Sequence, residues 1–122
     1  MDILLNLVIG FVTLLHVYFL YFEMFAWETT GRKVFKTFPK ALFKPTKSMA
    51  ANQGLYNGFL AAGLLWTFFI TNQYWQSNIR LFFLSCVAIA GIYGAMSVSK
   101  KIFFVQALPA IIGILMVLFI NY

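Results

Sequence analysis

Charged residues are scarce in this 122-residue chain: only 10% of its residues are Asp, Glu, Lys or Arg, and 62% are hydrophobic. Soluble domains carry roughly 25% charged residues, so a soluble globular protein is not expected. Nucleic-acid binding is not expected either, because the net charge of +6 comes from residues in connections, not from one basic face of a soluble domain. The apolar excess predicts an integral membrane protein.

The chain also has few residues for metal or thiol chemistry. Cys86 is the single cysteine and lies inside an apolar run, so no intrachain disulfide can form and a packing role is expected. His16 is the single histidine. A catalytic zinc site needs three protein ligands, and the sequence contains no phosphate loop, nucleophile elbow or cysteine pair. No metal site and no cofactor are therefore predicted.

Four long apolar stretches make up most of the chain. They cover residues 3–22, 49–70, 81–99 and 102–120. A helix needs about 20 apolar residues to cross the hydrocarbon core, and lipid cannot satisfy an open backbone. The stretches predict one all-α domain over residues 1–122, a transmembrane four-helix bundle that runs up-down-up-down. Its helices are expected at about 3–26, 49–72, 79–99 and 102–121, with a basic interfacial connection at 27–48.

Basic residues predict the orientation of the chain. Six lie in the first connection and two in the third, whereas Arg80 is the one assigned to the second. Because Lys and Arg accumulate on cytoplasmic loops, both termini are expected outside and the first and third connections in the cytoplasm. The protein is thus expected to be a multi-pass protein of the cell membrane. The lysines of the first connection are expected to meet anionic membrane lipid, unless this loop is solvated and only enforces the topology.

Polar side chains inside the apolar stretches fall at similar depth, towards the cytoplasmic side. Such a group is costly in hydrocarbon unless it faces a partner or a wet cavity, so these residues predict a pocket for a small or lipid-like molecule. The expected ligand-binding residues are His16, Glu23, Asn52, Gln53, Tyr56, Asn57, Tyr93 and Gln106. Hydrogen bonding that only fixes the bundle is the alternative explanation.

Three of these residues, His16, Glu23 and Tyr93, are candidates for catalysis. His16 and Glu23 are seven residues apart, which places both on one face of a helix. An imidazole titrates near neutral pH, and with an acid and a phenol it could bind a polar head or move protons. Whether the chain is an enzyme stays open. A small proton-coupled transporter and a structural or regulatory membrane protein with no ligand are the other function classes.

Small residues on the second stretch predict close helix packing. Gly54 and Gly58 are spaced by four, which lets two backbones approach closely in lipid. Packing between helices of one chain explains these residues, and a dimer face is the less favoured alternative. The expected state is therefore a monomer or a homo-oligomer. Small multidrug resistance transporters share the size and an early Glu, but their antiparallel dimers need a weak charge bias, which this chain lacks.

Several blocks of residues resemble a known family. They are EMFAWET (23–29), GRKVF (31–35), ANQGLYNGFLAAGL (51–64), AGIYGA (90–95) and FVQALPA (104–110). Together they are similar to the small bacterial membrane proteins of domain of unknown function 1304. The resemblance implies a four-helix integral protein of the cell membrane, with no established activity. The recurring motifs of that family coincide with seven of the polar residues above, which are Glu23, Asn52, Gln53, Tyr56, Asn57, Tyr93 and Gln106.

Overall fold

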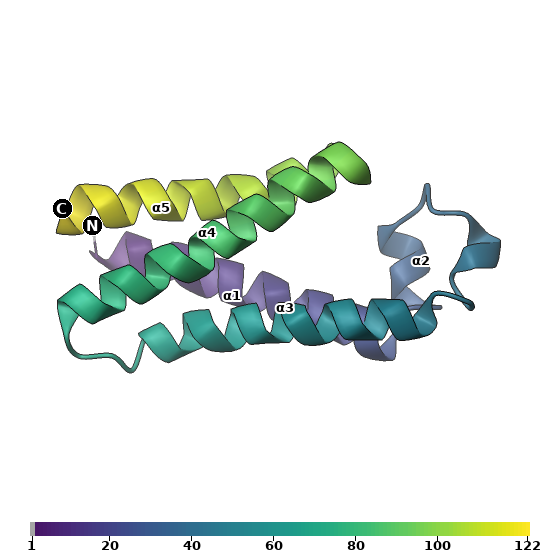
Figure 1. Ribbon diagram of the computed structural model, residues 1–122, viewed down its shortest axis with the longest axis horizontal. Coiled ribbons are helices and arrows are strands. Elements are labelled where there is room, and N and C mark those ends of the chain that lie inside the picture. The colour runs from purple at the N-terminus through teal and green to yellow at the C-terminus, as the bar shows by residue number, and fades with distance from the viewer. Residues whose placement is uncertain (1) are drawn as a thin grey trace. The chain divides into compact units, whose positions relative to one another are not determined.

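The computed structural model describes residues 2–122, and all regular structure in this part of the chain is helical, with no strand (Figure 1). The main helices are α1 (Asp2–Phe25), α3 (Lys47–Thr67), α4 (Gln73–Ser97) and α5 (Leu108–Asn121). The short ones are α2 (Thr30–Val34), the 3-10 turn η1 (Lys40–Leu42) and the π-helix η2 (Phe103–Ala107). The predicted all-α class is confirmed.

Three helical stretches are long and apolar enough to cross a membrane. They are α1, α4 and the stretch Phe103–Asn121, which consists of η2 and α5. Their composition is that of a multi-pass membrane protein. The second expected span falls on α3, which has 21 residues but is not one of these three. The half of α3 up to its midpoint carries Lys47, Asn52, Gln53 and Asn57, which lower its apolar character. A membrane crossing by α3 stays a prediction.

The described chain forms two compact units, one made of residues 2–13 with Ala62–Tyr122 and the other of Leu14–Ala61. In the first unit, α5 lies along α4 (Figure 1). The contact of α4 with η2 and α5 needs small residues, because a Cβ on Gly91 would lie 2.8 Å from the Cα of Ala107 in η2. Ala107 and Ala110 are fully buried. Close approach of backbones at small residues is how helices associate in lipid.

The last helical stretch is not a uniform α-helix, although an unbroken helix over 102–121 was expected. Residues Phe103–Ala107 form one π-helical segment, and α5 follows with a proline in its first turn. Pro109 has no backbone N–H and its ring crowds the carbonyl four residues earlier, so regular α-helical bonding is interrupted there. The π-helix is rare and occurs mostly as single segments of this kind within α-helices.

The start of α4 corrects the placement of Arg80, which had been assigned to the second connection. The helix begins at Gln73 instead of about residue 79, and Arg80 lies well inside it. Asn72 caps the helix, because its side-chain oxygen accepts a hydrogen bond of 3.1 Å from the backbone N–H of Trp75. An apolar run marks the stretch that suits lipid, whereas the cap decides where the helix begins.

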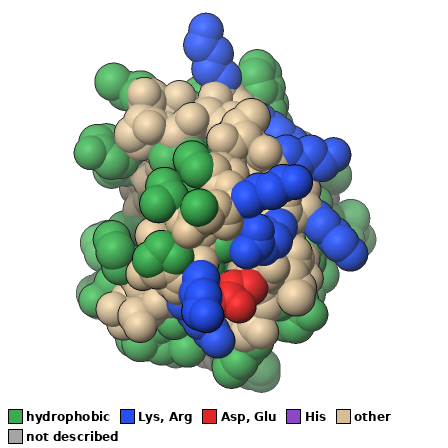
Figure 2. Space-filling model, turned by 90° about the vertical axis from the view of Figure 1, so that its right-hand side faces the viewer, with side chains coloured by type: hydrophobic (Ala, Val, Ile, Leu, Met, Phe, Trp, Pro, Cys, Tyr) green, Lys and Arg blue, Asp and Glu red, His purple; other side chains and the backbone are tan. Residues whose placement is uncertain are grey.

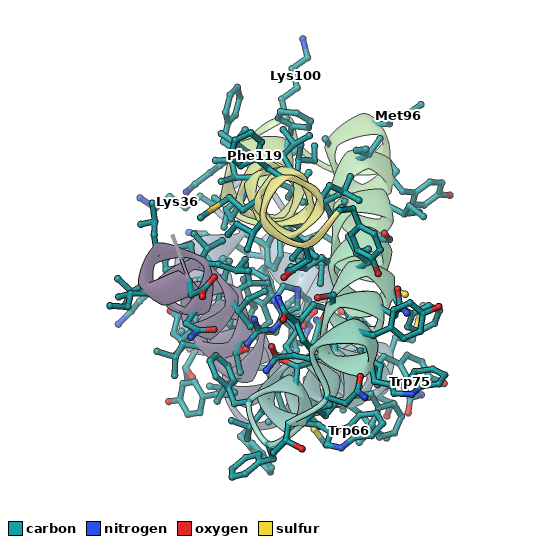
Figure 3. All side chains as sticks on the ribbon, turned by 90° about the vertical axis from the view of Figure 1, so that its left-hand side faces the viewer. Lys36, Trp66, Trp75, Met96, Lys100 and Phe119 are labelled. Atoms are coloured by element: carbon teal, nitrogen blue, oxygen red, sulfur yellow. The ribbon has the colours of Figure 1, made fainter. Side chains whose placement is uncertain are left out.

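Aromatic side chains flank the connection between α3 and α4. Trp66 is 55% exposed at the end of α3, and Trp75 is 58% exposed in the first turn of α4. Figure 3 shows both pointing away from the helices. Exposed Trp side chains at helix ends are typical of a membrane–water interface.

The second unit contains an aromatic cluster that includes side chains of the connection 27–48. Phe22, Trp27 and Phe43 are buried, and partly buried apolar residues of the connection pack against them. The indole Nε1 of Trp27 donates a hydrogen bond of 3.0 Å to Thr46 Oγ1. The connection 27–48 therefore turns its aromatic side chains inward onto its own unit. Its lysines are exposed. Figure 2 shows several Lys and Arg side chains on the surface that it draws.

Candidate functional site

A buried carboxyl group and an amide meet inside the second unit. Glu23, in the last turn of α1, is only 3% exposed. Asn57, midway along α3, donates a hydrogen bond of 2.5 Å from Nδ2 to Glu23 Oε1. A carboxylate offers about four acceptor positions, so one amide donor leaves it able to accept further hydrogen bonds. The structure thus brings two of the predicted site residues into contact.

Packing brings the two helices close at this point. A Cβ on Gly54 would lie 2.7 Å from Met24 Cγ and 3.0 Å from Glu23 Cβ. Any larger residue at position 54 would need these neighbours to move. Gly54 therefore permits the helix approach that the Glu23–Asn57 hydrogen bond requires.

His16 lies two helical turns before Glu23 and is completely buried. Its ring meets that of Phe19 edge-on, with centroids 5.1 Å apart. The spacing along α1 is too long for one direct hydrogen bond between His16 and Glu23. A link between His16 and Glu23 through water or ligand stays a prediction.

The other predicted residues are less enclosed. Asn52, Gln53 and Tyr56 on α3 are exposed. On α4, Tyr93 is 71% exposed. Gln106 lies in the π-helix η2 and is half-buried. The structure thus brings Glu23 and Asn57 into contact and leaves Gln53 and Tyr93 on the surfaces of their own units. A pocket lined by all the predicted residues stays a prediction.

No group of three His, Cys, Asp or Glu side chains within residues 2–122 is arranged to hold a metal ion. Cys86 is half-buried as a free thiol within α4. Chemistry at the candidate site would rest on the carboxyl group of Glu23, the amide of Asn57 and the imidazole of His16.

Sequence reasoning missed a buried arginine in the first unit. Arg80 is 4% exposed. Its Nε donates to Thr67 Oγ1 at 3.2 Å, and its Nη2 donates to Asn6 Oδ1 at 2.9 Å. Phe68 covers the guanidinium, with Cζ 5.3 Å from the ring centroid. Arg80 was interpreted as a marker of membrane topology and was not paired with Asn6. The signal for this pair was Asn6 itself, a polar residue inside the first apolar run.

Arg80 borders a cavity of about 350 Å³ within the first unit. Seven of the residues around it are polar or charged and three are apolar. The lining residues are Asp2, Leu5, Asn6, Phe68, Ile70, Thr71, Gln73, Gln76, Arg80 and Asn121. None of the residues predicted from the sequence to bind a ligand is among them.

A family model described as "Protein of unknown function (DUF1304)" matches residues 10–118. The chain belongs to the DUF1304 family. It is also similar to the uncharacterized protein YpaA of Lactococcus lactis subsp. lactis (strain IL1403), with 29% identity over 117 residues. That match covers 94% of this chain and 97% of the relative. No solved structure matches the chain significantly.

The DUF1304 match includes the whole Glu23 site but only part of the site around Arg80. His16, Glu23, Asn57 and Arg80 fall within residues 10–118, whereas Asn6 and Asp2 precede them. The family carries no described activity, so the function of this DUF1304 protein has to be argued from the sites themselves.

Proposed function

We propose that this chain is a multi-pass protein of the cell membrane that binds a small or lipid-like molecule through the polar group at Glu23. The observation that carries this proposal is the Glu23–Asn57 pair. The carboxyl group is buried in a helix apolar enough to cross a membrane, and its partner comes from another helix. Ionisable residues within membrane-spanning helices are rare and mark ligand, ion or proton sites more often than not.

The proposed arrangement has four long helices that run up-down-up-down, with α3 as the fourth crossing. Polar residues on α3 gather in its first half, whereas the second half is apolar. Both termini are outside in this proposal, and the connection 27–48 lies in the cytoplasm. The exposed lysines of that connection support this side, since they would meet the anionic lipid of the inner leaflet.

A ligand at Glu23 would be recognised by hydrogen bonds to the carboxyl group and to the amide. Asn57 is half-buried, so one side of the pair is reachable from the surface of α3. His16 lies two turns further along the same face of α1 and would set the inner limit of the site. A polar head with donors, attached to an apolar body, fits such a site because the surrounding side chains are apolar.

Mass spectrometry of molecules that copurify with the full chain tests this proposal. The variants are Glu23→Gln, which removes the carboxylate, and Glu28→Gln, a matched control with the same chemical change outside α1. Wild type and Glu28→Gln are expected to retain the same bound molecule, and Glu23→Gln to lose it. If no molecule copurifies with wild type, or if Glu23→Gln retains it, binding at Glu23 is rejected.

A second role rests on the same hydrogen bond, because a direct Glu23–Asn57 contact ties α1 to α3 without any ligand. Melting temperatures separate the two roles. A purely structural pair predicts a lower melting temperature for Glu23→Gln and no ligand in wild type. A ligand site predicts that adding back the copurified molecule raises the melting temperature of wild type but not of Glu23→Gln.

A further inference from the structure

Arg80 places a positive charge at the wall of the cavity that it borders, and its hydrogen-bond partners do not neutralise that charge. Arginine stays protonated in proteins, so Arg80 brings a full positive charge into a buried position. Its hydrogen-bond partners, Thr67 and Asn6, are both neutral. A buried charge is stabilised best by an opposite charge in contact with it.

Neighbouring hydrogen bonds hold the guanidinium in a defined position. The Thr67 hydroxyl donates to the carbonyl of Leu64 at 2.6 Å, which turns its lone pairs towards Arg80 Nε. Gln76 donates from Nε2 to the carbonyls of Thr67 and Ile70, which fixes the connection that forms the cavity wall. Preorganised donors lower the cost of ligand binding.

The single acid among the lining residues is Asp2, in the first turn of α1. It attracts Arg80 electrostatically, yet unlike Arg80 it is exposed. The cavity therefore carries a positive charge at a buried wall and a negative charge at an exposed position. A group with one anionic and one cationic end matches this distribution better than a simple anion does.

We propose that this cavity binds a phosphate ester that also carries an ammonium group, with the phosphate at Arg80 and the ammonium at Asp2. Arginine suits phosphate because its planar donors can engage two phosphate oxygens at once. The cavity volume of about 350 Å³ lies within the range of small-molecule sites. Leu5, Phe68 and Ile70 supply apolar wall for the carbon atoms of the ester.

Two sources supply this chemistry: a phosphatidylethanolamine headgroup and soluble phosphoethanolamine. The site uses none of the residues proposed to bind a ligand at Glu23, so the two proposals stand or fall separately. Two lining residues from different helices, Gln73 and Asn121, are joined by a hydrogen bond of 2.5 Å between Gln73 Nε2 and Asn121 Oδ1.

Calorimetry on the full chain in detergent, with phosphoethanolamine and inorganic phosphate as probes, tests whether the site binds the soluble ester. Native mass spectrometry of the chain released from nanodiscs of phosphatidylethanolamine or of phosphatidylglycerol tests whether it retains the lipid. Saturable binding of at least one ammonium-bearing probe is expected for wild type. Arg80→Gln should weaken it at least tenfold and Arg80→Lys less, because lysine keeps the charge but loses the planar donors. Lys101→Gln removes one exposed positive charge elsewhere and should bind as wild type does.

The outcomes assign the source or reject the site. Binding of phosphoethanolamine in solution supports the soluble source, and retention of phosphatidylethanolamine alone supports the headgroup. Absence of saturable binding of both by wild type overturns the proposal, as does equal binding by a folded Arg80→Gln. If Arg80→Gln fails to fold, Asp2→Asn decides, because its exposed carboxylate is not needed for packing. Asp2→Asn should lose the preference for ammonium-bearing probes over inorganic phosphate or phosphatidylglycerol, and an unchanged preference overturns the proposal.

Discussion

Asn57 on α3 donates a hydrogen bond of 2.5 Å to the carboxyl group of Glu23 on α1, at the level where Gly54 lets the two helices touch. The polar contact and a close packing contact of the two helices therefore coincide. A Cβ at position 54 would meet Glu23 Cβ at 3.0 Å and the backbone oxygen of Leu20 at 3.2 Å. The hydrogen bond depends on helix packing, and the packing keeps the carboxyl group buried.

A double-mutant cycle on Glu23 and Asn57 should show that the pair is energetically coupled. Glu23→Ala, Asn57→Ala and the double variant are compared by chemical unfolding in detergent micelles. A coupling free energy of about 1 kcal/mol is expected, since interhelical hydrogen bonds in membrane proteins contribute about that much. As a control, Glu23→Ala combined with Gln53→Ala should show no coupling, because Gln53 is exposed. A value near zero for both cycles would show that the Glu23–Asn57 contact contributes nothing to stability.

The contact between α4 and η2 should not accept a side chain at position 91. A Cβ there would lie 2.8 Å from Ala107 Cα, which is backbone and cannot rotate away. Gly91→Ala is expected to lower the free energy of unfolding by about 1–3 kcal/mol, the usual range for overpacking. Thermal unfolding followed by circular dichroism measures the change.

Gly10→Ala is the matched control for that substitution. Nothing lies within 4 Å of a Cβ at position 10, so this variant should unfold at the temperature of wild type or slightly above, because alanine favours helix. Equal stability losses at positions 10 and 91 would contradict the packing argument and point to helix propensity alone.

The helices could be predicted from the sequence because apolar composition alone determines which stretches suit lipid. Pairing Glu23 with Asn57 was also within reach, since both were expected at similar depth on neighbouring stretches. Gly54 likewise followed from its spacing to Gly58. Each of these inferences uses information contained in one helix or in the order of the helices along the chain.

Features that depend on contacts between distant residues could not be predicted in this way. Arg80 looked like a loop charge because its acceptors, Asn6 and Thr67, lie far away in the sequence. The early start of α4 depends on one cap at Asn72, which an apolar run does not reveal. The inward turn of Phe43 needed a partner surface, which Trp27 supplies with ring centroids 5.0 Å apart.

The aromatic cluster should be the main source of order in the connection 27–48. Phe43 is 1% exposed, and its ring also meets Phe38 at 4.9 Å between centroids. Phe43→Ala should cost about 3–5 kcal/mol, as for other large-to-small substitutions at buried aromatic positions, and should open the connection to proteolysis. Limited proteolysis with trypsin, which cleaves after the nearby lysines, reports the opening. Leu42→Ala, at a 44% exposed neighbour, should leave the digestion pattern unchanged.

The orientation of the chain is tested by cysteine labelling in intact cells. In a Cys86→Ala background, single cysteines replace Lys40 in the first connection and Thr71 between α3 and α4. Both positions are exposed, so a reagent can reach them, whereas Ser77 in α4 is buried and would report packing instead. A membrane-impermeant maleimide should label position 71 in intact cells and position 40 only after the membrane is permeabilised, because basic loops stay in the cytoplasm. Labelling of position 40 but not 71 in intact cells would reverse the orientation. Labelling of both before permeabilisation would place both connections outside, and α3 would then not cross the membrane.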